Sequence, residues 1–185
     1  MSSETGEGAE ITEKTNAPEN APEPTERPEA ASKKTLTEFG ETYVLNSSQR
    51  SDVLNTEEYI LAGQTPENWS QAIIYQRIAF SAPAAPDSLV GSIKKRIEEV
   101  SPGSQLRLVS QGKSASIFAV HYAKTAQQPE QVAIALAAVA DPKRPNELHL
   151  IQFALRPDRL DLATMERLVK RWQARFQSQA ASLNR

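Results

Sequence analysis

Four strand-like segments follow one another in the second half of the chain, separated only by short polar breaks. They occupy residues 105–110, 115–123, 131–140 and 147–155. A parallel connection needs a crossover of about a dozen residues or more, whereas antiparallel neighbours can be joined by a short turn. The breaks contain glycine or proline and fall below the crossover length. The segments therefore predict an antiparallel meander of four strands.

The third of these segments alternates large side chains with alanines. The large ones are Val132, Ile134 and Leu136, and the alanines are Ala133, Ala135 and Ala137. Successive strand residues point to opposite faces of a sheet, so each set occupies one face. A face of alanines allows a helix to approach closely. We expect this strand to be central and covered on both sides.

Two amphipathic segments predict helices. The first follows Ala-Pro-Ala-Ala-Pro at 82–86, with Asp87 as its expected cap and an apolar stripe formed by Leu89, Val90, Ile93, Ile97 and Val100. The second opens at Pro157-Asp158 and runs to about Ala181, with a stripe formed by Leu162, Met165, Leu168, Val169, Trp172 and Phe176. The second is the longer helix and closes the chain.

The first half of the folded region predicts three further strands, near 41–45, 57–61 and 73–80, with a polar loop at 46–52. Thr65-Pro66-Glu67 resembles a helix start, but the β-branched residues that follow allow one helical turn at most. The order of elements predicts an α+β fold. We expect an antiparallel sheet with a central four-strand meander, sandwiched by helices, in a single domain over 37–185.

Residues 1–36 have a different composition. The first 30 hold eight Glu, four Pro and only two basic residues, Lys14 and Arg27, for a net charge of −6. Such a segment cannot bury enough apolar surface to offset its chain entropy, which predicts a disordered acidic tail. It would serve as a tether or as a solubilising leader. The remaining residues carry +4, since the whole chain is −2, and this is too weak a charge to indicate nucleic-acid binding.

The chain contains no cysteine, which excludes disulfides, thiolate catalysis and zinc–thiolate sites. No segment approaches the ~20 apolar residues of a membrane span, and no signal peptide is expected within the chain. A lipidated cysteine upstream of Ser2 remains an open alternative to a native start at Met1.

One segment carries a family resemblance. A Tyr/Ile-rich strand, Gly63, Thr65 and Asn68-Trp69-Ser70 lead into Ile73-Ile74-Tyr75-Gln76. This pattern resembles PsbP-type domains, which include the extrinsic subunit of photosystem II, the yeast Ran-binding Mog protein and bacterial envelope lipoproteins. The order of elements over roughly 40–180 is similar too. The resemblance implies an antiparallel sheet between helices and a binding or assembly role without catalysis.

Few side chains suggest chemistry. His121 and His149 lie in different predicted strands without partners at ligand spacing, so we read each as a polar strand residue and expect no metal site. Glu57 and Glu58 should point to opposite faces, and Glu98 and Glu99 should lie on a solvated helix face. Neither pair predicts acid–base catalysis.

Tyr59 and Trp69 are the candidate partner-binding residues, because exposed aromatic residues are enriched in interface hot spots. The alternative for Trp69 is a plug at the edge of the core. We expect a non-catalytic binding or assembly module without cofactors that engages a protein partner, as a tethered periplasmic lipoprotein domain of the bacterial envelope. Any membrane contact would be through an N-terminal lipid anchor outside this chain. The alternative is a cytosolic adaptor or chaperone of the same fold.

Overall fold

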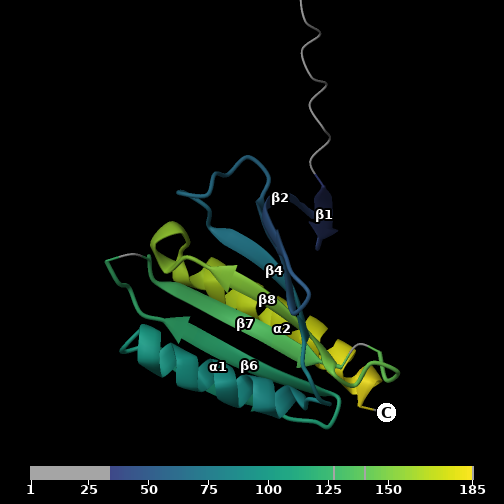
Figure 1. Cartoon of the computed structure of the whole chain (residues 1–185). Helices are drawn as coiled ribbons and strands as arrows, with labels where there is room; N and C mark the ends of the chain where they lie inside the picture. Colours follow the sequence, from purple (N-terminus) through teal and green to yellow (C-terminus); the bar gives the residue numbers. More distant parts are fainter. Residues whose placement is uncertain (1–33, 127, 140, 185) are drawn as a thin grey trace, which may run out of the picture. The chain divides into compact units, whose positions relative to one another are not determined.

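The computed structural model describes residues 34–126, 128–139 and 141–184, and contacts group 33–185 into one compact unit. Within the described residues, eight antiparallel strands form one sheet in the order β1-β2-β3-β4-β8-β7-β6-β5 (Figure 1). The first four are β1 (Thr35–Glu38), β2 (Glu41–Arg50), β3 (Leu54–Leu61) and β4 (Gln71–Ala79). The others are β5 (Gln105–Ser110), β6 (Ala115–Tyr122), β7 (Gln131–Ala138) and β8 (Glu147–Leu155).

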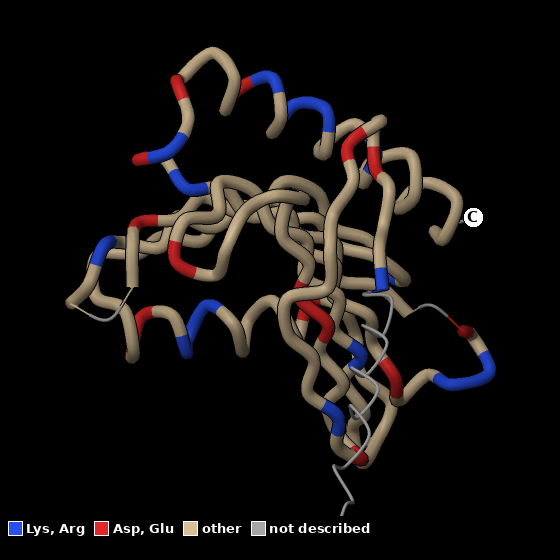
Figure 2. The backbone as a smooth tube through the Cα atoms, turned by 90° about the horizontal axis from the view of Figure 1, so that it is seen from above, with Lys and Arg blue, Asp and Glu red and all other residues tan. Residues whose placement is uncertain are grey.

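Two helices cover opposite faces of the same half of the sheet. Helix α1 (Pro86–Val100) packs on β5, β6 and β7, and helix α2 (Leu162–Leu183) packs on β6 and β7. Figure 2 shows the strands as a layer between the two helices. The α+β architecture and the long C-terminal helix are confirmed.

Strand β7 is covered on both faces, as its alternation predicts. Ile134 and Leu136 join the core beneath α2, which includes the fully buried Trp172. Ala135 and Ala137 face α1 and lie in the second core with Leu89. Helix α1 therefore packs against the small side chains of β7.

The sheet is larger than the predicted central four-strand meander. Strands β5 to β8 do pair consecutively, but they form one half of the sheet, and β8 pairs along its whole length with β4. Gln76 of β4 and Gln152 of β8 are hydrogen bonded across 76 positions of sequence. The local pattern of either strand contains no signal for such a distant partner.

Strand β2 continues to Arg50 through most of the predicted polar loop 46–52. Its last four residues, from Ser47 to Arg50, are exposed and pair with β3 after a register shift between Leu45 and Ser47. Polar side chains are tolerated there because this hairpin lies beyond the strands that the helices cover. Strand β1 begins at Thr35, two residues before the predicted start of the domain. The predicted disorder of 1–36 otherwise falls on 1–33, outside the described residues.

The helix ends differ from expectation in two places. Asp87 does not cap α1: the N-cap is Ala85, Pro86 follows it, and the Asp87 carboxylate accepts hydrogen bonds from Gln111 and Ser116. Helix α2 begins only after a short 3-10 helix (Pro157–Arg159), with Asp161 accepting from the Thr164 backbone N–H at 2.8 Å. Leu162 consequently lies in the exposed first turn, 66% exposed, rather than in the buried stripe. At the end of α1, Val100 is likewise 64% exposed.

None of the helices among the described residues is long and apolar enough to cross a membrane.

Candidate functional site

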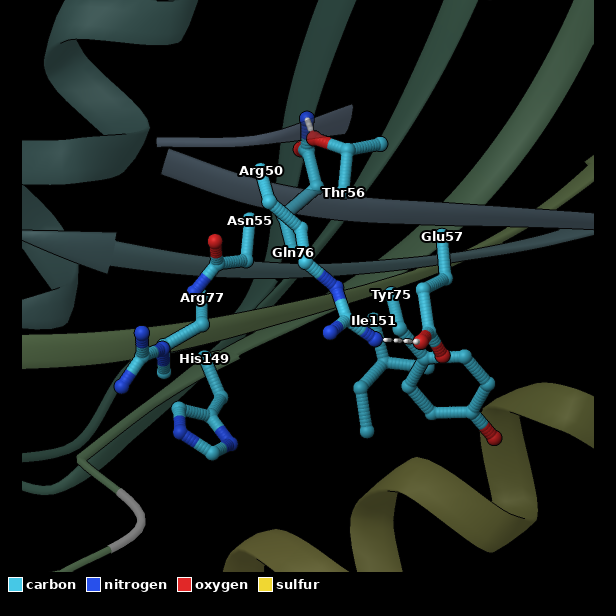
Figure 3. Close-up of a pocket in the computed structure, with 9 residues that line it drawn as sticks. All are labelled: Arg50, Asn55, Thr56, Glu57, Tyr75, Gln76, Arg77, His149 and Ile151. Atoms are coloured by element: carbon cyan, nitrogen blue, oxygen red, sulfur yellow. Dashed lines mark hydrogen bonds and ion pairs between the residues drawn. The ribbon is translucent and has the colours of Figure 1, made fainter. Parts of the chain in front are cut away.

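A groove of about 580 Å³ lies over β3, β4 and β8 beside α2 (Figure 3). Strand register places its side chains in rows. Arg77 of β4 stands between Asn55 of β3 and His149 of β8. Two residues further along, Tyr75 stands between Glu57 and Ile151. The groove is therefore polar at one end and partly apolar at the other.

Glu57 anchors one side of the groove. Its carboxylate accepts hydrogen bonds from Lys34 Nζ at 2.7 Å and from the Tyr59 hydroxyl at 2.7 Å, and Arg50 Nη2 lies 3.6 Å away. The hydrogen bond from Lys34 is the largest cause that lowers the pKa of Glu57, followed by that from Tyr59. Glu57 is therefore ionised and already paired at neutral pH.

Arg77 anchors the polar end of the groove. Its Nη1 donates to Glu147 at 3.2 Å. With the Asn55 amide turned so that its oxygen faces the guanidinium, Arg77 Nε donates to that oxygen at 3.0 Å. His149 Nε2 lies 3.2 Å from the same Glu147 carboxylate, and Arg144 lies 3.9 Å away. Arg77 is thus held from two sides, while its side chain stays 42% exposed.

A second feature is the loop that carries Trp69, between β3 and β4. Gln64 and Ser70 are joined by two hydrogen bonds: the Gln64 amide donates to Ser70 Oγ at 2.8 Å, and the Ser70 N–H donates to Gln64 Oε1 at 2.7 Å. Asn68 Oδ1 accepts from the Thr65 N–H at 2.8 Å. The Thr65-Pro66-Glu67 segment forms a turn and no helix. Side-chain bonds therefore fix the loop.

Arg156 ties this loop to the end of β8. Its side chain is only 9% exposed, and it donates to both carboxylate oxygens of Asp158, at 3.1 and 2.8 Å. A further bond runs from Arg156 Nη1 to the Glu67 carbonyl at 2.8 Å. The Arg156 guanidinium also lies 5.8 Å from the centroid of the Trp69 ring. A buried arginine with this many partners is a rigid support for the ring beside it.

Trp69 is half-buried against four apolar residues on the α1 side of the sheet. These are Ile60, Ala72, Ala133 and Ala154, one from each of four neighbouring strands. A cavity of about 400 Å³ adjoins the same loop, lined in part by Val44, Ile60 and Pro66. The Trp69 ring thus covers a small apolar floor while part of it faces solvent.

The other predicted candidate, Tyr59, is buried at 3% exposed. Its ring meets Tyr75 edge-on, with centroids 6.1 Å apart, and its hydroxyl donates to Glu57. In this arrangement Tyr59 positions Glu57 at the groove and offers little of its own surface to a partner. The structure does not bring Tyr59 and Trp69 together, because they lie on opposite faces of the sheet.

The two histidines lie far apart. His121 of β6 opposes Val132, whereas His149 of β8 opposes Ala138 at the other end of β7. His121 contacts Glu130 at 2.7 Å. Within the residues that the structure describes, no three His, Cys, Asp or Glu side chains are grouped to hold a metal ion.

The predicted separation of the paired carboxylates holds. Glu57 faces the groove, whereas Glu58 accepts from the Asn46 amide at 2.8 Å on the other face. Glu98 and Glu99 are exposed on α1.

The groove was not predicted from the sequence, although one signal was present. Arg77 shares a strand face with the buried residue Ile73 and with Tyr75. A charged residue on a core-facing side needs partners, and these mark the groove. The partners come from distant segments, with Glu147 seventy positions away.

A protein-family model matches residues 30–183, which is most of the chain. No curated protein matches the chain, and no solved structure does. The chain therefore belongs to the protein family whose model spans residues 30–183.

Proposed function

We propose that this protein is a non-catalytic binding and assembly module that engages a protein partner through the loop carrying Trp69. The observation that carries the proposal is the support of this ring by Arg156. That guanidinium is buried, paired with Asp158 and bonded to the loop backbone at Glu67. The arrangement holds a partly exposed tryptophan in one orientation before any partner arrives.

Pre-organisation of this kind favours binding. Ordering a flexible loop on association costs free energy, and a loop already fixed by its own hydrogen bonds avoids much of that cost. Tryptophan is the residue type most enriched at the energetic centre of interfaces. The adjoining cavity is lined by apolar residues such as Val44 and Ile60 and by the polar residues Asn46, Gln64 and Thr65, and it offers a recess beside the same loop for a side chain of the partner.

The absence of catalysis is part of the proposal. The two carboxylates that flank the groove, Glu57 and Glu147, are each engaged with cationic side chains. A carboxylate that acts as a general base instead needs an oxygen that is free to accept a proton from the substrate. The ion pairs of these two residues favour a binding role for the groove.

We place the module in the bacterial envelope, as a PsbP-type lipoprotein domain. Support comes from the residue pattern around Trp69 and from the acidic Pro/Glu composition of 1–36, which suits a tether. Fractionation of cells that express the native gene tests this placement. We expect the protein in the membrane fraction. Recovery in the cytosol would favour the cytosolic adaptor or chaperone.

The binding surface is tested by affinity capture with the wild type and the variant Trp69→Ala. We expect a stoichiometric partner that the variant loses, while circular dichroism shows an intact fold. Leu162→Ala is the matched control, since Leu162 is an exposed apolar residue at the start of α2, and it should retain the partner. Retention of the partner by a folded Trp69→Ala variant would contradict the proposed surface.

A further inference from the structure

We propose that the groove over β3, β4 and β8 binds a small amphipathic anion. Its acidic head group, a carboxylate or a phosphate monoester, would lie on Arg77 and Arg50, and its apolar chain on Tyr75 and Ile151. This site is separate from the Trp69 loop, which lies on the other face of the sheet. The inference therefore stands independently of the proposed function.

The charge around the groove favours an anion. Four cationic side chains, Lys34, Arg50, Arg77 and Arg144, face three carboxylates, Glu57, Asp141 and Glu147. Four against three leaves one positive charge in excess. Both acidic residues nearest the cavity already have partners, whereas Arg50 is 78% exposed and lies only loosely against Glu57, at 3.6 Å.

Arg77 has the geometry of a prepared anion receptor. Glu147 and Asn55 fix its guanidinium from two sides, and its side chain remains 42% exposed at the groove. Asn55 accepts from Nε and Nη2, and Glu147 accepts from Nη1. Of the five N–H groups of the guanidinium, two therefore remain to donate to a carboxylate or phosphate. Figure 3 shows Arg77 and His149 together at one end of the groove.

The other end of the groove supplies apolar surface. Tyr75 and Ile151 are neighbours across the β4–β8 pair, and both are half-buried. Strand geometry places Tyr75 about 7 Å from Arg77 on the same face. The apolar row continues to Ile73 and Phe153 beneath α2. A ligand with its head on Arg77 would therefore direct its chain toward α2.

Tyr75 adds one donor along this path. Its hydroxyl forms no hydrogen bond with any residue of the described ranges, and burial raises the pKa of its phenol. The phenol therefore stays protonated, and its hydroxyl points away from Arg77, where it is available to a polar atom farther along a ligand (Figure 3). A volume of about 580 Å³ is in the range of small-molecule sites, which are mostly 300–1,000 Å³.

Calorimetric titration of the full chain tests the inference, with octanoate and octyl phosphate as separate probes. Saturable binding of either supports the site, and the tighter of the two identifies the head group. Acetate lacks the chain and octylammonium reverses the charge, so both should bind at least tenfold more weakly. Equal binding of octylammonium, or no binding of either anion, would overturn the proposal.

Variants locate the ligand. Loss of one charge-assisted contact should weaken binding about tenfold in Arg77→Gln and in Arg50→Gln. Arg50→Gln keeps the test decisive if Arg77→Gln unfolds, because Arg50 is the more exposed residue. Arg107→Gln, on the exposed edge strand β5, is the control and should bind as the wild type does. Undiminished binding by folded Arg50→Gln would also overturn the proposal.

Discussion

The ring of Phe39 meets the ring of Trp172 edge-on, with centroids 5.3 Å apart and planes at 86°. Phe39 lies in the turn between β1 and β2 with a left-handed φ of 54°, followed by Gly40 at 83°. A bulky residue seldom adopts this conformation. The guanidinium of Arg171, 4.7 Å from the Phe39 centroid, covers the ring. The contact fastens the first hairpin to α2.

Removal of this ring should weaken the fold. Phe39→Ala loses the aromatic and cation–π contacts while the left-handed turn remains, and we expect the free energy of unfolding to fall by about 1–2 kcal/mol. Phe39→Asn loses the same contacts but suits the backbone conformation, so it should lose less. Urea unfolding measures both. A Phe39→Asn variant less stable than Phe39→Ala would contradict this account.

The end of α2 is tied to the start of β6 through one side chain. Asn184 Oδ1 accepts from the Ser114 N–H at 2.8 Å and from the Ala115 N–H at 3.2 Å. A Cβ at Gly112 would collide with the Asn184 amide. Gly112→Ala should therefore expel that amide and cost about 1–2 kcal/mol.

Asn184→Ala removes the same bonds directly. Because the two substitutions act on one contact, the double variant should cost clearly less than the sum of the single ones. Thermal unfolding of the four proteins measures this coupling. Full additivity would show that Gly112 and Asn184 act separately.

The support of the Trp69 loop should depend on pH. Hydrogen bonds from Arg156 are the main cause that lowers the pKa of Asp158. A depressed carboxyl pKa contributes stability that is complete above the unfolded value, near 4, and is lost as pH falls through the folded value. The stability difference between wild type and Asp158→Asn should thus be largest at neutral pH and shrink below about pH 4. A difference that stays constant down to pH 3 would contradict it.

Strand β7 should not accept a large residue on its α1 face. Ala135 is fully buried there, at 0% exposed. Ala135→Leu should force α1 away from the sheet and lower the free energy of unfolding by about 1–3 kcal/mol. Ala62→Leu, at an exposed position after β3, is the control and should change stability little. Equal effects of the two in urea unfolding would show that the alanine face is not close-packed.

The sequence predicted features that depend on neighbouring residues. The alternation of Val132, Ile134 and Leu136 with alanines is visible in one segment, because the period of a strand is two residues. It correctly placed a helix on each face of β7. The antiparallel pairing of four consecutive strands was likewise predicted, from strand-like segments separated by short breaks that contain glycine or proline.

The features that the sequence did not predict depend on distant partners. The β4–β8 pairing and the bond between Arg77 and Glu147 each join segments about 70 positions apart. The predicted cap at Asp87 was wrong for a related reason. Aspartate favours helix N-caps, but the Asp87 carboxylate accepts hydrogen bonds from Gln111 and Ser116 and does not cap the helix. For Trp69, the sequence is compatible with two interpretations, a plug at the edge of the core and a partner-binding residue. The ring covers alanines with one part and faces solvent with the rest.

Site-specific photo-crosslinking in living cells tests the central claim most directly. A photoreactive amino acid replaces Pro66, which is exposed in the loop that carries Trp69, or Val53, which is 63% exposed in the turn between β2 and β3. We expect a discrete protein adduct from position 66, its loss when Trp69→Ala is added, and no adduct from position 53. An adduct from position 53 alone, or one from position 66 that survives Trp69→Ala, would contradict a partner surface at Trp69.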